Sequence, residues 1–190
     1  MNNTIRKYGF FASTTICILS LLSWFVGKDL DFTTQEVIGY ASMIVSLSFV
    51  FFGIKHFRDT YNNGTITFGK AFLIGVLISL SAAITFGLLD VVYVKFINPD
   101  FLSEYYDASL AQMKEDLSPE AFELKLADLE SQKELFSNIW VNFLVMSMTV
   151  FVIGGILSVL SAMILKRKVW KGVKNIIPSF STPLHMNKIH

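Results

Sequence analysis

Four long apolar segments constrain the fold of this chain more than any other feature. They cover about residues 8–26, 37–54, 71–94 and 139–165. A helix needs about 20 mainly apolar residues to cross the hydrocarbon core of a bilayer, and a chain in lipid must satisfy its backbone hydrogen bonds internally. Only 16% of the 190 residues are charged, well below the fraction of about 25% in soluble domains. The sequence therefore predicts an all-α, polytopic membrane protein with four transmembrane helices.

The first apolar segment resembles a signal peptide, because Arg6 and Lys7 precede it. The bulky residues 24–26, however, offer no small-x-small cleavage site. We expect this segment to remain as the first transmembrane helix. Cys17 is the single cysteine of the chain, so no intrachain disulfide can form.

Lysine and arginine residues predict the orientation in the membrane, because they are enriched in cytoplasmic loops. They gather before the first span, between spans two and three, and after span four: Arg6, Lys7, Lys55, Arg58, Lys70, Lys166, Arg167, Lys168, Lys171, Lys174 and Lys188. With four spans, these regions lie on one side. We therefore predict a multi-pass protein of the cell inner (plasma) membrane with both termini in the cytoplasm. The aromatic residues agree, since Trp24, Tyr40, Tyr93, Trp140, Tyr8 and Trp170 fall at span ends.

The connection between spans three and four is long and strongly acidic. Asn98-Pro99 and Ser118-Pro119 each place a capping residue before a proline, which is a typical helix start. We predict an acidic, extracytoplasmic helical hairpin over about residues 99–136, either separate from spans three and four or continuous with them. Residues 1–168 would form the membrane domain, and residues 169–190 a basic cytoplasmic tail that is first amphipathic and then disordered.

Small residues recur at every fourth position in spans three and four. They are Gly75, Ser79, Ala83 and Gly87 in span three, and Gly154, Ser158 and Ala162 in span four. Small side chains let transmembrane helices approach closely, because lipid supplies little hydrophobic drive for their association. The pattern favours helix packing. A pore or substrate groove along the same faces is the alternative.

Asp90 is the only acidic residue within the four predicted spans. An ionisable group within a membrane is expensive and marks a functional site by default. At 1.5 Å per residue, Asp90 lies roughly 28 Å from the cytoplasmic start of span three, near the outer headgroups. There the carboxylate is less costly, and it could pair with Lys95 or Lys28.

The loop between spans two and three contains Arg58, Asp59 and Lys70, and its residues 61–65 form a turn signal rich in Asn and Gly. We interpret Arg58, Asp59 and Lys70 as a structural clamp in a rigid connector. The alternative is a docking surface for a partner or a lipid headgroup.

The sequence offers no motif for catalysis or cofactor binding. His56, His185 and His190 lack neighbouring ligands at metal-binding spacing, and no nucleophile–base pattern or phosphate loop is visible. The basic residues flank membrane spans, so they do not indicate nucleic-acid binding. We predict a protein that is not an enzyme and has no catalytic, cofactor or metal residues; its partners are the lipid bilayer and a membrane protein or a second copy.

Several motifs together resemble an uncharacterised bacterial family of four-span membrane proteins, catalogued as a domain of unknown function. They are residues 54–59 (Ile-Lys-His-Phe-Arg-Asp), Gly64, residues 66–72 (Ile-Thr-Phe-Gly-Lys-Ala-Phe), Gly75, residues 98–101 (Asn-Pro-Asp-Phe) and residues 166–168 (Lys-Arg-Lys). The resemblance covers about residues 5–168. It implies a four-span fold, and it assigns no activity and no catalytic residue.

Two classes of function follow for an integral membrane protein of unknown molecular function. The first is a non-enzymatic scaffold or accessory subunit. The second is a small transporter or channel subunit with a path along spans three and four. Asp90 distinguishes them, because a water-reached Asp90 facing the bundle favours transport, and an interfacial Asp90 over a closed bundle favours the scaffold.

Overall fold

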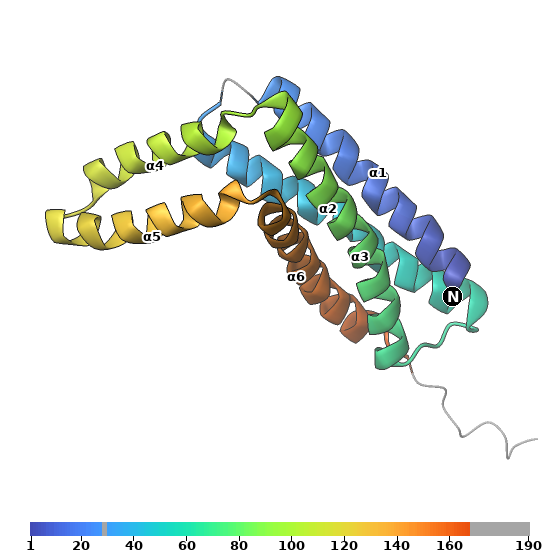
Figure 1. Ribbon diagram of the computed structural model, residues 1–190. Coiled ribbons are helices and arrows are strands. Elements are labelled where there is room, and N and C mark those ends of the chain that lie inside the picture. The colour runs from blue at the N-terminus through green and yellow to red at the C-terminus, as the bar shows by residue number, and fades with distance from the viewer. Residues whose placement is uncertain (28–29, 168–190) are drawn as a thin grey trace, which may run out of the picture.

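Four long helices form a bundle, and two further helices project from one end of it (Figure 1). The computed structural model describes residues 1–27 and 30–167. In order, the elements are α1 (Asn2–Val26), α2 (Phe32–Tyr61), α3 (Phe68–Val92), the π-helical turn η1 (Tyr93–Ile97), α4 (Phe101–Asp116), α5 (Pro119–Ser137) and α6 (Ile139–Leu165). The segments Asn2–Val26, Phe32–Tyr61, Phe68–Ile97 and Ile139–Leu165 are long and apolar enough to cross a membrane. The predicted all-α architecture is therefore confirmed.

Some predictions lie outside the described residues. These are Lys28 as a partner of Asp90, Lys168 at the end of the predicted membrane domain, the inner-end residue Trp170, and the basic tail over residues 169–190.

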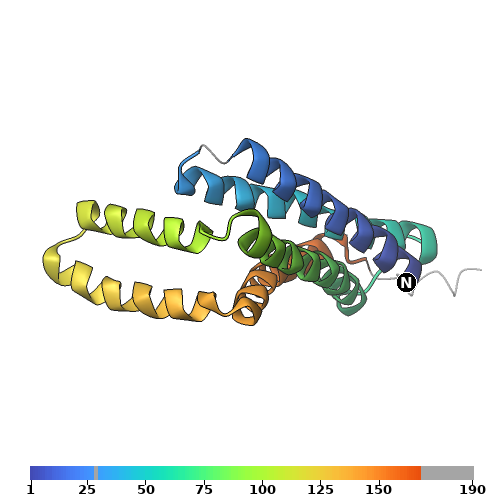
Figure 2. The same cartoon turned by 45° about the horizontal axis from the view of Figure 1, so that its top comes forward.

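Helix α3 lies at the centre of the bundle and packs against α1, α2 and α6. Its largest interface is with α6, and α1 packs mainly along α2 and α3 (Figure 2). Large apolar side chains fill the interior, and Leu47, Val50, Ile74 and Ile78 are fully buried. Buried residues from all four long helices thus form one continuous core.

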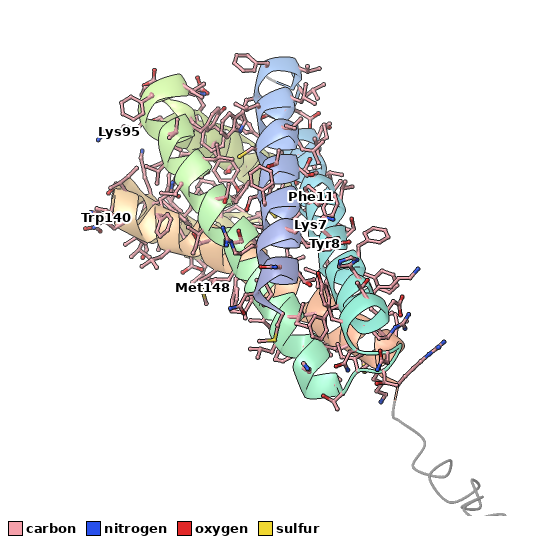
Figure 3. The ribbon with its side chains drawn as sticks, turned by 90° about the vertical axis from the view of Figure 1, so that its right-hand side faces the viewer. Lys7, Tyr8, Phe11, Lys95, Trp140 and Met148 are labelled. Carbon is pink, nitrogen blue, oxygen red and sulfur yellow. The ribbon has the colours of Figure 1, made fainter. Side chains whose placement is uncertain are left out.

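Apolar side chains also cover the outside of the bundle. Trp140 and Met148 on α6 are 74% and 54% exposed, and both point away from the bundle (Figure 3). Exposed apolar residues occur on all four long helices, as expected for a surface surrounded by lipid tails. The outer surface therefore supports the prediction that these helices contact a bilayer.

The long helices extend beyond the predicted apolar segments because polar residues cap them. Helix α2 begins five residues before the predicted span, where a carboxylate oxygen of Asp31 accepts a hydrogen bond from the Thr34 amide at 2.8 Å. The other oxygen accepts the Thr34 hydroxyl at 2.7 Å. These bonds hold the pKa of Asp31 below its ordinary value, and the bond from the Thr34 hydroxyl contributes most. An ionised N-cap satisfies amides that a helix end leaves without partners.

Helices α4 and α5 form an antiparallel hairpin that leaves the bundle sideways (Figures 1 and 2). Ser118 caps α5, with Pro119 at the first helical position, as the sequence indicates. The alternative of helices continuous with the spans is wrong, because residues 98–100 separate η1 from α4, and Asn138 separates α5 from α6.

The predicted helix start at Asn98-Pro99 is also wrong. The Phe101 amide donates to the Asn98 carbonyl at 3.2 Å, and Asp100 has φ −89° and ψ −5°. These values match the third position of a type I turn with proline at its second position. The Asn98 side chain donates to Glu104 at 2.9 Å instead of accepting from the helix, so α4 begins only at Phe101.

Candidate functional site

The end of the bundle opposite the hairpin contains the predicted clamp, and we call it the loop end. Arg58 donates from Nε and Nη2 to the two carboxylate oxygens of Asp59 at 2.6 and 3.0 Å. The Arg58 side chain is 11% exposed, and that of Asp59 is 43% exposed. The Nζ atom of Lys70 lies 5.0 Å from the centre of the Phe57 ring. The structure therefore pairs Arg58 with Asp59, and a separate cation–π contact connects Lys70 of α3 to Phe57 of α2.

The loop itself is held by local turns and by the end of α6. Asn63 and Gly64 both adopt positive φ values, 49° and 74°, which these two residue types tolerate. Ile66 and Arg167 then exchange two backbone hydrogen bonds of 3.1 and 3.0 Å, and the Ile66 side chain is buried. These contacts attach the loop between α2 and α3 to the end of α6.

The small residues predicted to pack helices lie in the interface between α3 and α6. A Cβ atom added to Gly75 would lie 2.6 Å from Oγ of Ser158, and one added to Gly154 would lie 2.5 Å from Cβ of Ser79. Each serine hydroxyl donates to the glycine carbonyl four residues earlier in its own helix, at 2.9 Å for Ser79 and 2.6 Å for Ser158. The two Gly-x-x-x-Ser pairs thus face each other in antiparallel order, with their polar groups satisfied.

The other predicted packing residues are buried as well. Ala83 and Ala162 are at most 1% exposed. A Cβ atom on Gly87 would lie 3.0 Å from the backbone oxygen of Phe143 on α6. The backbones of α3 and α6 therefore remain close as far as Gly87, one turn before Asp90.

Asp90 lies on α3 and forms a hydrogen bond across this interface. The Nδ2 atom of Asn142 on α6 donates to Oδ2 of Asp90 at 2.6 Å. Asn142 is only 6% exposed, and Asp90 is partly buried. Lys95, the predicted partner, forms no ion pair with Asp90; its Nζ atom lies 5.6 Å from the centre of the Phe96 ring. An amide on the neighbouring helix therefore replaces the expected ion pair.

Asp90 and Asn142 line a cavity of about 730 Å³ between the bundle and the hairpin. We call this hollow the hairpin-end cavity. The four long helices line it, and α4 and α5 also contribute residues. Its polar lining includes Ser20, Ser23 and Gln35 besides Asp90 and Asn142. Glu36, Lys95 and Lys133 also line it, and apolar side chains supply most of the remaining lining. A mainly apolar hollow of this size with convergent polar groups has the features of a site for a small molecule.

Aromatic side chains from four elements surround the cavity. Trp24 of α1 stacks on Tyr93 of η1 with ring centres 4.7 Å apart, and Tyr93 contacts Phe101 of α4 at 5.3 Å. Phe32 of α2 contacts Phe101 at 6.0 Å and Tyr105 at 5.7 Å. These residues all line the cavity, so the aromatic contacts connect the hairpin to the bundle around it.

Tyr106 of α4 also lines the cavity and is only 5% exposed. Its hydroxyl has no hydrogen-bond partner within the described part of the chain. The Nζ atom of Lys133 on α5 lies 4.5 Å from the centre of the Tyr106 ring. Burial, with a smaller contribution from Glu130, raises the pKa of the Tyr106 hydroxyl, so this group stays protonated as a hydrogen-bond donor.

The comparison with protein families matches a family described as "Protein of unknown function (DUF4199)" over residues 7–167. The chain belongs to the DUF4199 family. No curated protein and no solved structure matches it. The resemblance of the sequence to a family of unknown function is confirmed, and this DUF4199 chain is an integral membrane protein of unknown molecular function.

Within the DUF4199 region, sequence reasoning missed Asn142, Tyr106 and the pairing of Ile66 with Arg167. Asn142 carried a usable signal, because a polar amide within an apolar span is costly unless it is hydrogen-bonded. Tyr106 falls among apolar residues at helical spacing, which indicates a buried face, but the surroundings of its hydroxyl depend on where α5 and the bundle lie. The Ile66–Arg167 pairing joins residues 101 positions apart, and no local pattern predicts it.

Proposed function

We propose that this protein is a non-enzymatic scaffold or accessory subunit of a membrane, and that the bundle itself conducts nothing. The observation that carries the proposal is the closed interface of α3 and α6, where Gly75 faces Ser158 and Gly154 faces Ser79. A transport path along these helices would require their backbones to separate. Contacts this close instead support a fixed platform that holds the hairpin.

The extent of the hairpin-end cavity supports the same function. Its lining residues reach Ile16 on α1, Met43 on α2, Phe86 on α3 and Thr149 on α6. One turn further along α2, Leu47 is fully buried, and so are Ile78 and Ser79 on α3. The cavity therefore has a packed floor, and its polar groups serve binding at one end of the bundle better than passage through it.

The proposed orientation places the loop end in the cytoplasm and the hairpin outside the plasma membrane. It is supported by the basic residues near the loop end. Residues 95–138 contain ten acidic residues and four lysines, so the hairpin would present a charged surface on the other side. Its partner in this proposal is another membrane protein or a second copy of the chain.

Cysteine accessibility tests the closed bundle against the transporter alternative, which the position of Asp90 favours. In a Cys17→Ala background, single cysteines replace Ser79, Ser158 or the cavity residue Ser23. A charged thiol reagent is then added to either side of sealed vesicles. We expect labelling of Ser23→Cys from the hairpin side only, and none of Ser79→Cys or Ser158→Cys. Labelling of both interface positions would contradict the proposal and support a transport path.

A further inference from the structure

The pair formed by Asp90 and Asn142 has unused capacity to accept hydrogen bonds. A carboxylate only accepts hydrogen bonds, so the amide nitrogen of Asn142 faces it. Among the described residues, none donates to Oδ1 of Asp90 or to the side-chain oxygen of Asn142. Both residues line the hairpin-end cavity. Two neighbouring oxygens, one of them charged, are suited to a ligand that carries several N–H donors.

The charge of Asp90 also lacks a counterion within the described chain. The ion pair within the described residues joins Arg58 to Asp59, and it lies at the loop end, away from Asp90. Two lysines line the cavity, but Lys95 lies over the ring of Phe96, and Lys133 lies over the ring of Tyr106. A bound cation would offset the cost of this partly buried carboxylate, so the site is suited to a positively charged ligand.

The rest of the cavity is suited to hydrocarbon and to an ammonium group. Its lining includes Ile16, Met43, Val145 and Met146, and Trp24 and Tyr93 stand beside them. Aromatic faces attract ammonium ions, and this attraction grows when water is excluded. The buried Tyr106 hydroxyl adds a further polar group without a described partner. Apolar walls around the partly buried carboxylate of Asp90 suit an amphipathic cation.

We propose that the hairpin-end cavity binds an amphipathic primary amine. The ammonium group lies on the oxygens of Asp90 and Asn142, and the hydrocarbon part lies along the apolar lining. A primary ammonium has three N–H donors, whereas a quaternary ammonium has none. The amine belongs either to the headgroup of an ethanolamine phospholipid or to a free alkylamine. The inference goes beyond the scaffold function and does not depend on it.

Trp24 provides a direct reporter, because it lines the cavity. The chain has three tryptophans, so Trp140→Phe and Trp170→Phe leave Trp24 alone. The full chain is placed in nanodiscs of phosphatidylcholine and phosphatidylglycerol and titrated with dodecylammonium, dodecanol or dodecyltrimethylammonium. We expect the emission of Trp24 to change at dodecylammonium concentrations at least tenfold below those needed for the other two compounds. If dodecanol bound with the same apparent affinity as dodecylammonium, the proposal would be overturned, and no variant of the site would be needed to show it.

Two variants then locate the charge. Asp90→Asn keeps the shape and removes the charge, and we expect it to weaken dodecylammonium binding at least tenfold while dodecanol binding is unchanged. Glu36→Gln is the matched control, because Glu36 also lines the cavity but is exposed; we expect a change of less than threefold. Unchanged amine binding in Asp90→Asn would overturn the proposal, as would an equal loss in both variants.

The source of the amine is distinguished by lipid composition. If the ligand is a phospholipid headgroup, phosphatidylethanolamine in the nanodisc changes the Trp24 emission of the wild-type cavity but not that of Asp90→Asn, and dodecylammonium competes with it. If the ligand is a free amine, only dodecylammonium produces the change. Failure of both lipid and free amine refutes the site. Labelling of Ser79→Cys with retained amine binding would instead refute only the closed bundle.

Discussion

Gly154→Ala is the sharpest test of the interface between α3 and α6. The added Cβ atom would lie 2.5 Å from both Cβ and Oγ of Ser79 and 3.3 Å from Cδ2 of Leu47. The Ser79 hydroxyl can rotate away, but its Cβ is fixed to the backbone. The two helices must therefore separate by several tenths of an ångström or more, and overpacking of this kind typically costs about 1–3 kcal/mol.

Gly155→Ala is a matched control on the same helix. A Cβ atom at Gly155 has no neighbour within 4 Å. Both substitutions remove a helical glycine and gain about the same propensity, roughly 0.5–1 kcal/mol. The difference between the two variants therefore isolates the packing cost. For a domain of this size, a cost of 1–3 kcal/mol corresponds to a Tm difference of roughly 2–12 °C.

The assay is thermal unfolding of both variants in the same detergent or nanodisc, followed by circular dichroism. We expect Gly154→Ala to melt below Gly155→Ala, and the further substitution Ser79→Gly to recover part of the loss by removing the opposing Cβ atom. Non-additivity of this kind is expected for residues in contact. Equal Tm values for Gly154→Ala and Gly155→Ala would refute the close approach of α3 and α6.

Three further predictions concern orientation, the loop and the cap of α2. An impermeant thiol reagent outside intact cells should label Ser109→Cys and not Asn63→Cys in a background without Cys17; the reverse pattern would refute the proposed orientation. Arg58→Lys should leave Tm within about 2 °C of wild type, because the Asp59 carboxylate of the ion pair is exposed to solvent, and a pair screened in this way contributes little; a large loss of abundance would indicate a buried partner at the loop. Asp31→Ala should lower Tm at neutral pH. Since the pKa of Asp31 is held below its ordinary value, its contribution disappears as the pH falls through that lowered pKa, and the Tm curves of variant and wild type should then converge.

The membrane helices were predictable because lipid leaves the backbone few alternatives. The predicted fourth span over residues 139–165 coincides with α6, since Asn138 caps it and no polar run extends it. The span of α2 was underestimated, because Phe32–Tyr61 includes polar turns at both ends that hydropathy alone excludes. Composition therefore locates a span, and the capping residues decide where its helix ends.

The hairpin shows where local patterns become ambiguous. Ser118-Pro119 begins a helix, as predicted, whereas Asn98-Pro99 forms a turn. Both dipeptides fit a helix start, and the outcome at Asn98 depends on the preceding π-helical turn, whose Tyr93 carbonyl accepts the Asn98 amide at 2.9 Å. That bond fixes the direction of the chain before Pro99, and no residue near Asn98 encodes it alone.

The sequence predicted one residue of the candidate site, Asp90, but not its partner Asn142. Asp90 stood out as an acid within a span, but its environment depended on Asn142, which is 52 residues away in the chain. Because α3 and α6 are antiparallel, the facing position could have been located only if the packing register were known. The glycines of the two helices supply that register, since Gly75 faces Ser158 and Gly154 faces Ser79.

Along this register, the polar groups of the interface change from satisfied to unsatisfied. In the half of the interface nearer the loop end, Ser79 and Ser158 donate to carbonyls of their own helices and require nothing more. Further toward the hairpin, the buried hydroxyl of Ser147 has no partner among the described residues. Asp90 and Asn142 come next, and they satisfy each other only in part. Departures from full satisfaction are expected at functional sites rather than in a structural core. The same interface thus provides a closed platform at one end and, where its pairing becomes incomplete, the polar floor of a binding cavity at the other.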